Sequence, residues 1–209
     1  MSFMPNTLYD VIAETWPAAK LHRAGQWTIR DGQGGGKRVS AATADGSVQP
    51  IDIQQAESAM QELGQRPLFM LRDGEADLDA LLANAGYEMI DPTNLYQAPI
   101  ANIATQRPPR TSMFCIWEPL QIQYDIWAAG GITRPRLSIM QRTTAKKTSL
   151  FGRWNNRPAA TGFAAIHAGT AMVHAVEVLA QQRGQKVATW LMRAAAFWAA
   201  EQGGTRLAV

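Results

Sequence analysis

The chain has 209 residues, a hydrophobic content of 46% and a formal net charge of +3, which are ordinary values for one or two globular domains. The charge is too small to indicate nucleic-acid binding, because no basic stripe with interleaved aromatic residues accompanies it. No apolar run approaches the ~20 residues of a membrane span, and no signal-peptide pattern is present. The single cysteine, Cys115, excludes an internal disulfide and favours a cytoplasmic location. The three histidines lack metal-ligand spacing, so no metal is expected.

Residues 1–100 are predicted to form a separate α/β module. Apolar residues at helical spacing predict helices near Ile53–Leu63 and Leu78–Ala85, each followed by a glycine. Short strands are predicted at 26–30 and at Leu68–Leu71. Residues 101–112 contain two prolines and little periodicity, which is typical of a linker. Residues 113–209 then form the second domain.

The second domain begins with an apolar strand near 114–117, followed by a helix that ends at Gly130. Two strands predicted at 148–154 and 158–167 form a hairpin. The next run, Ala171–Val178, is apolar except at His174 and Glu177, which indicates a strand buried on both faces.

A polar turn follows that strand, and apolar residues recur at helical spacing from Val187 onwards. Gly203-Gly204 ends this helix, and a further strand is predicted at 205–209. The segment is therefore a βαβ unit. A helix that starts after a strand presents free N–H groups and its positive dipole end, which together favour an anion such as phosphate. Arg183 and Lys186 add positive charge there. The alternative is an ordinary connection with solvated basic residues.

This turn resembles the acetyl-CoA-binding motif of the GNAT superfamily of N-acetyltransferases, in which an Arg/Gln-x-x-Gly-x-Gly/Ala loop cradles the pyrophosphate. Arg183 and Ala188 match the first and last positions of the motif, whereas Lys186 stands where the family has glycine. The element order of residues 113–209 is also similar to the GNAT order. The expected fold class is therefore α/β with a mixed sheet, with a GNAT-like acetyl-CoA-binding fold in the C-terminal half. Residues 1–100 resemble part of a GNAT domain in element order, which suggests a degenerate second copy without a cofactor loop.

The resemblance implies an acetyl-CoA-dependent N-acetyltransferase that acetylates a primary amine of a small-molecule or peptide acceptor. No nucleic-acid or membrane partner is expected. The helix from Val187 carries apolar residues around much of its circumference, so we expect either the first module or a second subunit of a homodimer to cover it. The alternative function is a non-catalytic acetyl-CoA-binding or regulatory module that has lost turnover.

The resemblance also assigns candidate roles to individual residues. It places pantetheine beside the strand that ends at Val178 and the pyrophosphate at the loop and helix start. The candidate cofactor-binding residues are Val176, Val178, Arg183, Gly184, Gln185, Lys186, Val187, Ala188 and Thr189.

Glu177 is the candidate general base, and the alternative is a structural glutamate paired with a nearby arginine. Tyr124 and Trp127 are candidate acceptor contacts. His174 is three residues from Glu177, so strand alternation puts it on the opposite face as a core histidine. GNAT domains continue past the last strand predicted here. We therefore expect either a polypeptide that extends beyond Val209 or a replacement of the missing elements by the first module or a partner.

Overall fold

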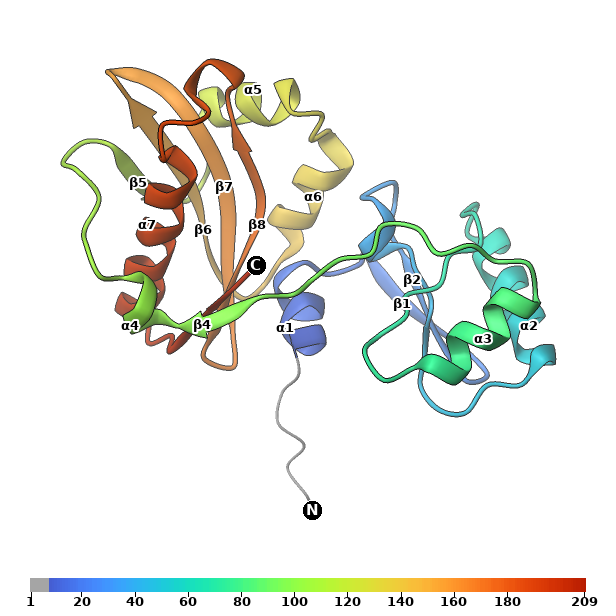
Figure 1. The fold of residues 1–209 in the computed structure, drawn as a ribbon. Coiled ribbons are helices and arrows are strands. Elements are labelled where there is room, and N and C mark those ends of the chain that lie inside the picture. The colour runs from blue at the N-terminus through green and yellow to red at the C-terminus, as the bar shows by residue number, and fades with distance from the viewer. Residues whose placement is uncertain (1–7) are drawn as a thin grey trace. The chain divides into compact units, whose positions relative to one another are not determined.

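The computed structural model describes residues 8–209 and divides the chain into two compact units (Figure 1). The larger unit contains the described residues up to Pro17 together with Leu95–Val209, and the smaller unit is Ala18–Asn94. These bounds differ from the predicted module 1–100 and linker 101–112. The reason is that residues 97–103 form strand β4 and helix α4 of the larger unit. Short elements of this kind have too few residues to show a period in the sequence.

The larger unit is built on a six-stranded mixed sheet in the order β4-β9-β8-β7-β6-β5. All neighbouring strands are antiparallel except β8 and β9, which are parallel. The strands are β4 (Gln97–Pro99), β5 (Met113–Ile116), β6 (Lys146–Trp154), β7 (Arg157–His167), β8 (Thr170–Val178) and β9 (Arg206–Ala208). The predicted hairpin and the predicted mixed sheet are thus confirmed.

Helix α7 (Val187–Glu201) connects β8 to the parallel strand β9, which confirms the predicted βαβ unit. The helix packs on β5 to β8, and its buried Leu191 joins a core with Leu150 of β6. Strand β7 presents small residues to this helix. A Cβ on Gly162 would lie 3.2 Å from Leu191 Cδ2, so a larger residue at this position would press on the Leu191 side chain.

The outward side of α7 is covered by residues of the same unit. Helix α4 (Ile100–Ile103) packs there, and the Arg107 guanidinium lies 4.5 Å from the ring centroid of Phe197. The apolar circumference of α7 therefore has an intramolecular explanation. The homodimer stays a prediction.

The opposite face of the sheet carries α1 (Leu8–Thr15) and α5 (Gln121–Ala129), and α6 (Arg134–Arg142) follows α5. Val11 and Ile12 of α1 pack on Met172 and Ala208. Strand β4 pairs with β9 and continues the pairing through a 2.9 Å bond from Tyr96 N to Val209 O. Strand β9 is therefore not a sheet edge. Strand β4 and helix α1 precede the other strands of this sheet in the sequence, and both lie beside β9.

A β-bulge interrupts β8 in the middle of the candidate site. Phe163 pairs with His174, and Thr161 pairs with Glu177, so two residues of β8 stand opposite the single residue Gly162. Ala175 takes a left-handed conformation with φ +50°. The extra residue reverses the alternation of faces, and Glu177 consequently lies on the same face as His174. The prediction that these two residues face opposite ways is wrong.

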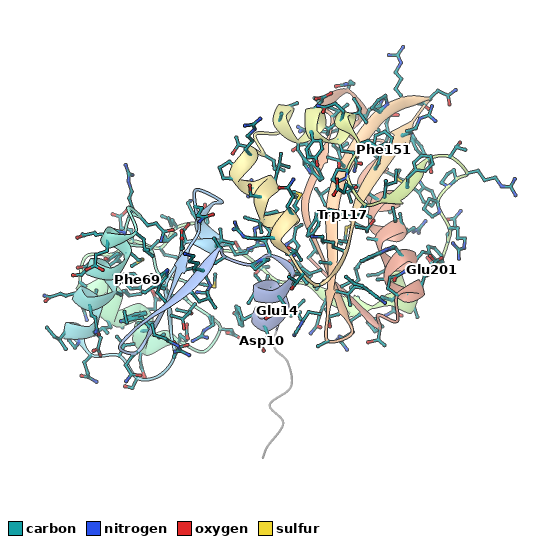
Figure 2. The ribbon with its side chains drawn as sticks, turned by 180° about the vertical axis from the view of Figure 1, so that it is seen from behind. Asp10, Glu14, Phe69, Trp117, Phe151 and Glu201 are labelled. Carbon is teal, nitrogen blue, oxygen red and sulfur yellow. The ribbon has the colours of Figure 1, made fainter. Side chains whose placement is uncertain are left out.

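The smaller unit contains an antiparallel sheet in the order β1-β2-β3. Its elements are β1 (Lys20–Ala24), β2 (Trp27–Asp31), the 3₁₀ helix η1 (Lys37–Val39), β3 (Thr43–Ala44), α2 (Pro50–Glu62) and α3 (Ala76–Asn84). Figure 2 labels Phe69 in this unit. Its ring centroid lies 4.9 Å from that of Trp27 and 5.0 Å from that of Tyr87. The strand predicted at Leu68–Leu71 is reduced to a single parallel bridge between Ala42 and Phe69. A degenerate GNAT copy is not confirmed by this arrangement.

Candidate functional site

The turn after β8 forms a pocket of about 220 Å³ at the start of α7. The chain passes through the 3₁₀ helix η2 (Ala180–Gln182) and then enters the helix at Val187. The pocket is lined by six of the predicted cofactor-binding residues, namely Val178, Arg183, Gly184, Lys186, Val187 and Ala188. These six residues therefore lie together around one concave surface.

The N-terminus of α7 presents backbone donors to this pocket. The first backbone bond of the helix runs from Trp190 N to Lys186 O at 3.1 Å. The N–H groups of residues 187–189 therefore have no acceptor within the helix. Ala188 and Thr189 are exposed, so a ligand can approach these donors. Together with the helix dipole, they make the pocket suited to an anion.

Three predicted cofactor residues do not line the pocket. Gln185 accepts a 3.1 Å hydrogen bond from Asn155 Nδ2 at the β6–β7 turn. Val176 packs against the core under α7. Thr189 is on the exposed first turn of the helix, outside the pocket lining.

The backbone conformation of Lys186 shows how a non-glycine residue occupies the glycine position of the motif. It is the N-cap of α7 and adopts the left-handed conformation, with φ 61° and ψ 17°. Gly184, two residues earlier, has φ +75°. The turn thus needs two positive-φ residues, of which only Gly184 adopts that conformation without a steric cost.

Arg183, the expected pyrophosphate ligand, binds groups of its own strand. Its Nη2 donates to Glu177 Oε1 at 3.0 Å, and its Nε donates to the Val178 carbonyl at 2.9 Å. This is the ion pair that the sequence left open as the alternative for Glu177. Most of the Arg183 side chain remains exposed, whereas Glu177 is largely covered.

Glu177 is covered by the C-terminal end of α5. A Cβ on Gly130 would lie 2.3 Å from Glu177 Oε2, so only glycine leaves room for this carboxylate. Oε1 is bound to Arg183, and Oε2 is the oxygen that faces Gly130. The carboxylate is thus held between Arg183 of the turn after β8 and the C-terminal end of α5.

Trp127 is not placed to contact an acceptor. Its side chain is 0% exposed, and its indole Nε1 donates to the Ala175 carbonyl at 2.8 Å. It therefore supports the bulge in β8, and the acceptor-binding prediction for it is wrong. The amphipathic pattern of α5 puts Trp127 on the sheet-facing side, where a large aromatic residue is buried. Tyr124, one turn earlier, lines a second pocket.

Gln123 is a positioning residue that sequence reasoning missed. It is fully buried, and its Nε2 donates to the Leu150 carbonyl and to Thr161 Oγ1 at 3.2 and 3.1 Å. Its Oε1 accepts from Leu120 N at 2.9 Å. Because a buried amide must have its hydrogen bonds satisfied, these contacts fix the start of α5 on β6 and β7. A glutamine inside an apolar stripe was the available signal.

Two other groups, His174 and Cys115, are poorly suited to catalysis. His174 is buried, and its Nε2 lies 2.9 Å from Thr15 Oγ1, which agrees with the predicted core histidine. Desolvation raises the pKa of Cys115 to about 11, so its nucleophilic thiolate is scarce near neutral pH. In residues 8–209, no cluster of three or more potential ligands could hold a metal ion. No helix within that range is long and apolar enough to span a membrane.

Comparison with known proteins finds a family match for the segment that contains β8, the turn after it and α7. Residues 116–209 match the model of the acetyltransferase (GNAT) family. This segment, a little under half of the chain, is similar to the GNAT acetyltransferase family. No curated protein matches the sequence.

Solved structures share the fold of the chain. A GCN5-related N-acetyltransferase from Kribbella flavida is similar with a TM-score of 0.69 and 17% identity, covering 95% of this chain and 81% of that one. A functionally unknown conserved protein from Staphylococcus epidermidis is similar with a TM-score of 0.62 and 10% identity, covering 92% of this chain and 83% of that one. At these identities the likeness shows the fold alone. The family match supports acetyl transfer, and the acceptor is a separate question.

Proposed function

We propose that the protein is an acetyl-CoA-dependent N-acetyltransferase that acts on a primary amine. The observation that carries the proposal is the pocket at the start of α7, where open backbone N–H groups coincide with the motif positions Arg183–Ala188. The pyrophosphate of acetyl-CoA would bind these donors, since a helix N-terminus favours an anion. Pantetheine would run beside β8, past the backbone of Val176 and Val178.

The chemistry requires a stabilised oxyanion and a proton acceptor. The amine nitrogen attacks the thioester carbonyl carbon, a tetrahedral intermediate forms, and the C–S bond then breaks to give the amide and the CoA thiol. The bulge at Ala175 and Val176 interrupts the pairing of β8 with β7, and such a bulge leaves backbone groups unpaired. We assign these N–H groups as donors to the oxyanion, where positioned donors lower the barrier.

Glu177 is the proposed general base. Its Oε1 is bound to Arg183, and Oε2 accepts the proton of the acceptor ammonium, directly or through water. Arg183 is then a positioning residue that sets the orientation of the carboxylate. This differs from a direct role of Arg183 on the pyrophosphate, although one guanidinium has enough donors for both tasks.

A non-catalytic acetyl-CoA-binding module is the second candidate. The observation that favours it is the same ion pair, because a carboxylate held by an arginine is also a purely structural arrangement. The further proposal that residues 1–100 are a degenerate second GNAT copy is supported by the order of β3, α2 and the parallel bridge at Phe69.

Acetyl-CoA turnover with a panel of amines separates the two candidates. The intact protein is incubated with acetyl-CoA and each amine, and released CoA thiol and acetylated amine are quantified together. Equal amounts of both products support the transferase. Saturable acetyl-CoA binding without either product, across aliphatic amines, polyamines and peptides, would support the binding module.

A further inference from the structure

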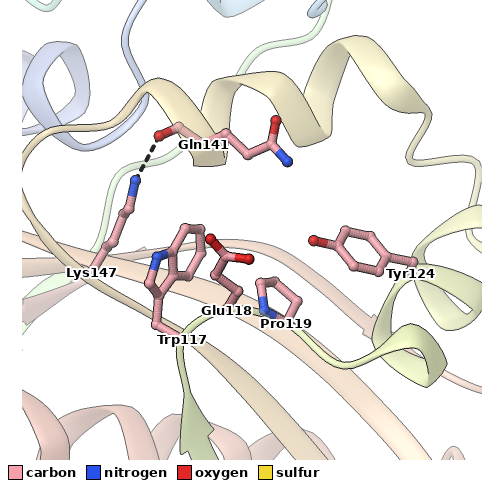
Figure 3. A pocket seen from close by; sticks show the side chains of 6 residues that line it. All are labelled: Trp117, Glu118, Pro119, Tyr124, Gln141 and Lys147. Carbon is pink, nitrogen blue, oxygen red and sulfur yellow. Dashed lines mark hydrogen bonds between the residues drawn. The ribbon is translucent and has the colours of Figure 1, made fainter.

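A second pocket of about 370 Å³ lies on the face of the sheet that carries α5 and α6 (Figure 3). It is lined by Trp117, Glu118, Pro119, Tyr124, Gln141 and Lys147. These residues come from the β5–α5 loop, α5, α6 and the start of β6. In Figure 3 the Glu118 carboxylate stands between the Trp117 ring and the Tyr124 hydroxyl and points into the pocket.

Lys147 is not available to neutralise this carboxylate. Its Nζ donates to the carbonyls of Met140, Gln141 and Thr143 at 3.0, 2.7 and 2.6 Å. These three bonds use all three protons of an ammonium group and hold it at the C-terminal end of α6, where the helix dipole favours a cation. Lys147 is therefore a structural cap, and it is poorly suited to bind an anionic ligand.

Glu118 is consequently an uncompensated acid at the pocket. Across residues 8–209, no hydrogen bond or ion pair reaches its carboxylate. Its charge acts on Lys147 only through space, where it opposes the lowering of the lysine pKa by burial. The charged group of the lining that remains open to a ligand is thus the Glu118 carboxylate, which favours a positively charged group.

The aromatic walls reinforce that preference. Trp117 is 37% exposed and already has Lys147 Nζ 4.5 Å from its ring centroid, which shows that this ring accepts a cation. Tyr124 contributes a second ring, whose other contact is the buried Trp127 at 6.0 Å. Aromatic faces beside a carboxylate are the usual surroundings of a bound alkylammonium ion.

Helix α5 relates this pocket to the proposed reaction centre. Tyr124 and Gly130 are six residues apart on α5 and its end, a rise of about 9 Å along a helix axis. Gly130 is in contact range of Glu177. A ligand with one ammonium group at Glu118 must therefore be extended for its reacting amine to reach Glu177.

We propose that this pocket binds the distal ammonium group of the acceptor, and that the acceptor is a small aliphatic di- or polyamine. The proposal rests on the proposed acetyltransferase function. The pocket volume lies at the small end of the ~300–1,000 Å³ range of small-molecule sites, which favours a small acceptor over a folded protein.

Calorimetric titration of the intact protein tests the proposal, with spermidine and hexylamine as probes, in the presence of CoA. Spermidine should bind, and hexylamine should bind about tenfold more weakly or worse, since it lacks the second charge. Glu118→Gln should weaken spermidine binding by about tenfold or more, the scale of a lost charge-assisted contact. Asp125→Asn removes a neighbouring exposed carboxylate of α5 and should leave spermidine affinity near that of the wild type.

Equal affinity for hexylamine and spermidine, or spermidine affinity unchanged in Glu118→Gln, would overturn the proposal. A lysine-containing peptide that binds about tenfold more tightly than spermidine and depends on Glu118 would also overturn it, in favour of a peptide acceptor. A failure of the proposed transferase function has a different signature. No amine would then be acetylated at the expense of acetyl-CoA, whether or not acetyl-CoA binds, while Glu118-dependent binding of spermidine would persist in the protein without CoA.

Discussion

Arg183 Nη2 lies 3.0 Å from Glu177 Oε1, so the first arginine of the anion-binding turn holds the candidate base of the adjacent strand. Such a partly exposed pair contributes little to stability, about 0–1 kcal/mol. Its main effect is to orient the Glu177 carboxylate. The same guanidinium donates to the Val178 carbonyl, and this second bond fixes the direction from which Arg183 reaches Glu177.

Glu177→Gln should lower kcat at neutral pH by roughly 10²-fold, the usual scale of general-base assistance. An amide keeps the shape of the side chain and a hydrogen bond to Arg183 but cannot take a proton. Acetyl-CoA affinity should stay close to the wild-type value. Steady-state kinetics and calorimetry check this, with Asp125→Asn as a charge-matched control. Undiminished turnover in a folded Glu177→Gln protein would remove Glu177 from the mechanism.

Gly130→Ala should reduce turnover without a large loss of stability. Gly130 has φ −86°, which alanine adopts freely, but the new Cβ would meet Glu177 Oε2 at 2.3 Å and displace that flexible carboxylate. Gly131→Ala is the matched control. Its φ is +77° and no atom lies within 4 Å of the added Cβ, so that variant should lose about 1 kcal/mol of stability and keep its turnover. Unchanged turnover in Gly130→Ala, with reduced turnover in Gly131→Ala, would show that catalysis does not depend on the position of the Glu177 carboxylate.

Trp127→Phe should destabilise the protein by about 1–3 kcal/mol, because the partly buried Ala175 carbonyl loses its indole donor. Turnover should fall because the bulge in β8 loses the hydrogen bond that holds it in place. Acetyl-CoA affinity should stay close to the wild-type value. Urea unfolding and kinetics measure the two effects. Trp190→Phe, which alters a ring stacked on Arg193, is the control and should stay within about 1 kcal/mol of the wild type. An equally small effect at Trp127 would contradict its assigned role.

Lys186→Gly should bind acetyl-CoA as tightly as the wild type or more tightly. The left-handed backbone at this position, φ 61°, costs a non-glycine residue about 1–2 kcal/mol, and glycine also removes a Cβ beside the phosphate site. Calorimetry at two salt concentrations checks this. A loss of about tenfold or more, confined to low salt, would instead show that the Lys186 ammonium binds a phosphate.

The βαβ unit and its anion-binding turn could be predicted because several local signals agree there. The apolar run of β8, the change of period at Val187 and the stop at Gly203 all indicate the same elements. The bulge at Ala175 could not be predicted, because a strand that is apolar on both faces carries no alternation in which an extra residue would show. The faces of His174 and Glu177 were therefore assigned incorrectly.

Other features of the fold depend on contacts between residues far apart in the sequence, which the local sequence pattern could not predict. Strand β4 has three residues, and its position beside β9 depends on pairing across more than a hundred residues. The prolines near residue 108 suggested a linker, yet helix α4 at 100–103 packs on α7. Neither Glu118 nor Trp117 was predicted from the sequence to be a site residue. Their significance arises only when α6 folds over them and Lys147 is used as its cap.

The central claim is that acetyl-CoA binds at the start of α7, and calorimetric titration of Ala188→Glu against Ala200→Glu tests it most directly. Both alanines are exposed on α7, at its first and last turns. A glutamate in the first turn favours the helix dipole, so lost binding in Ala188→Glu would not reflect unfolding. The wild type and Ala200→Glu should bind acetyl-CoA, and Ala188→Glu should bind about tenfold more weakly or worse, since its carboxylate repels the pyrophosphate. No binding to the wild type, or equal binding to both variants, would contradict the account.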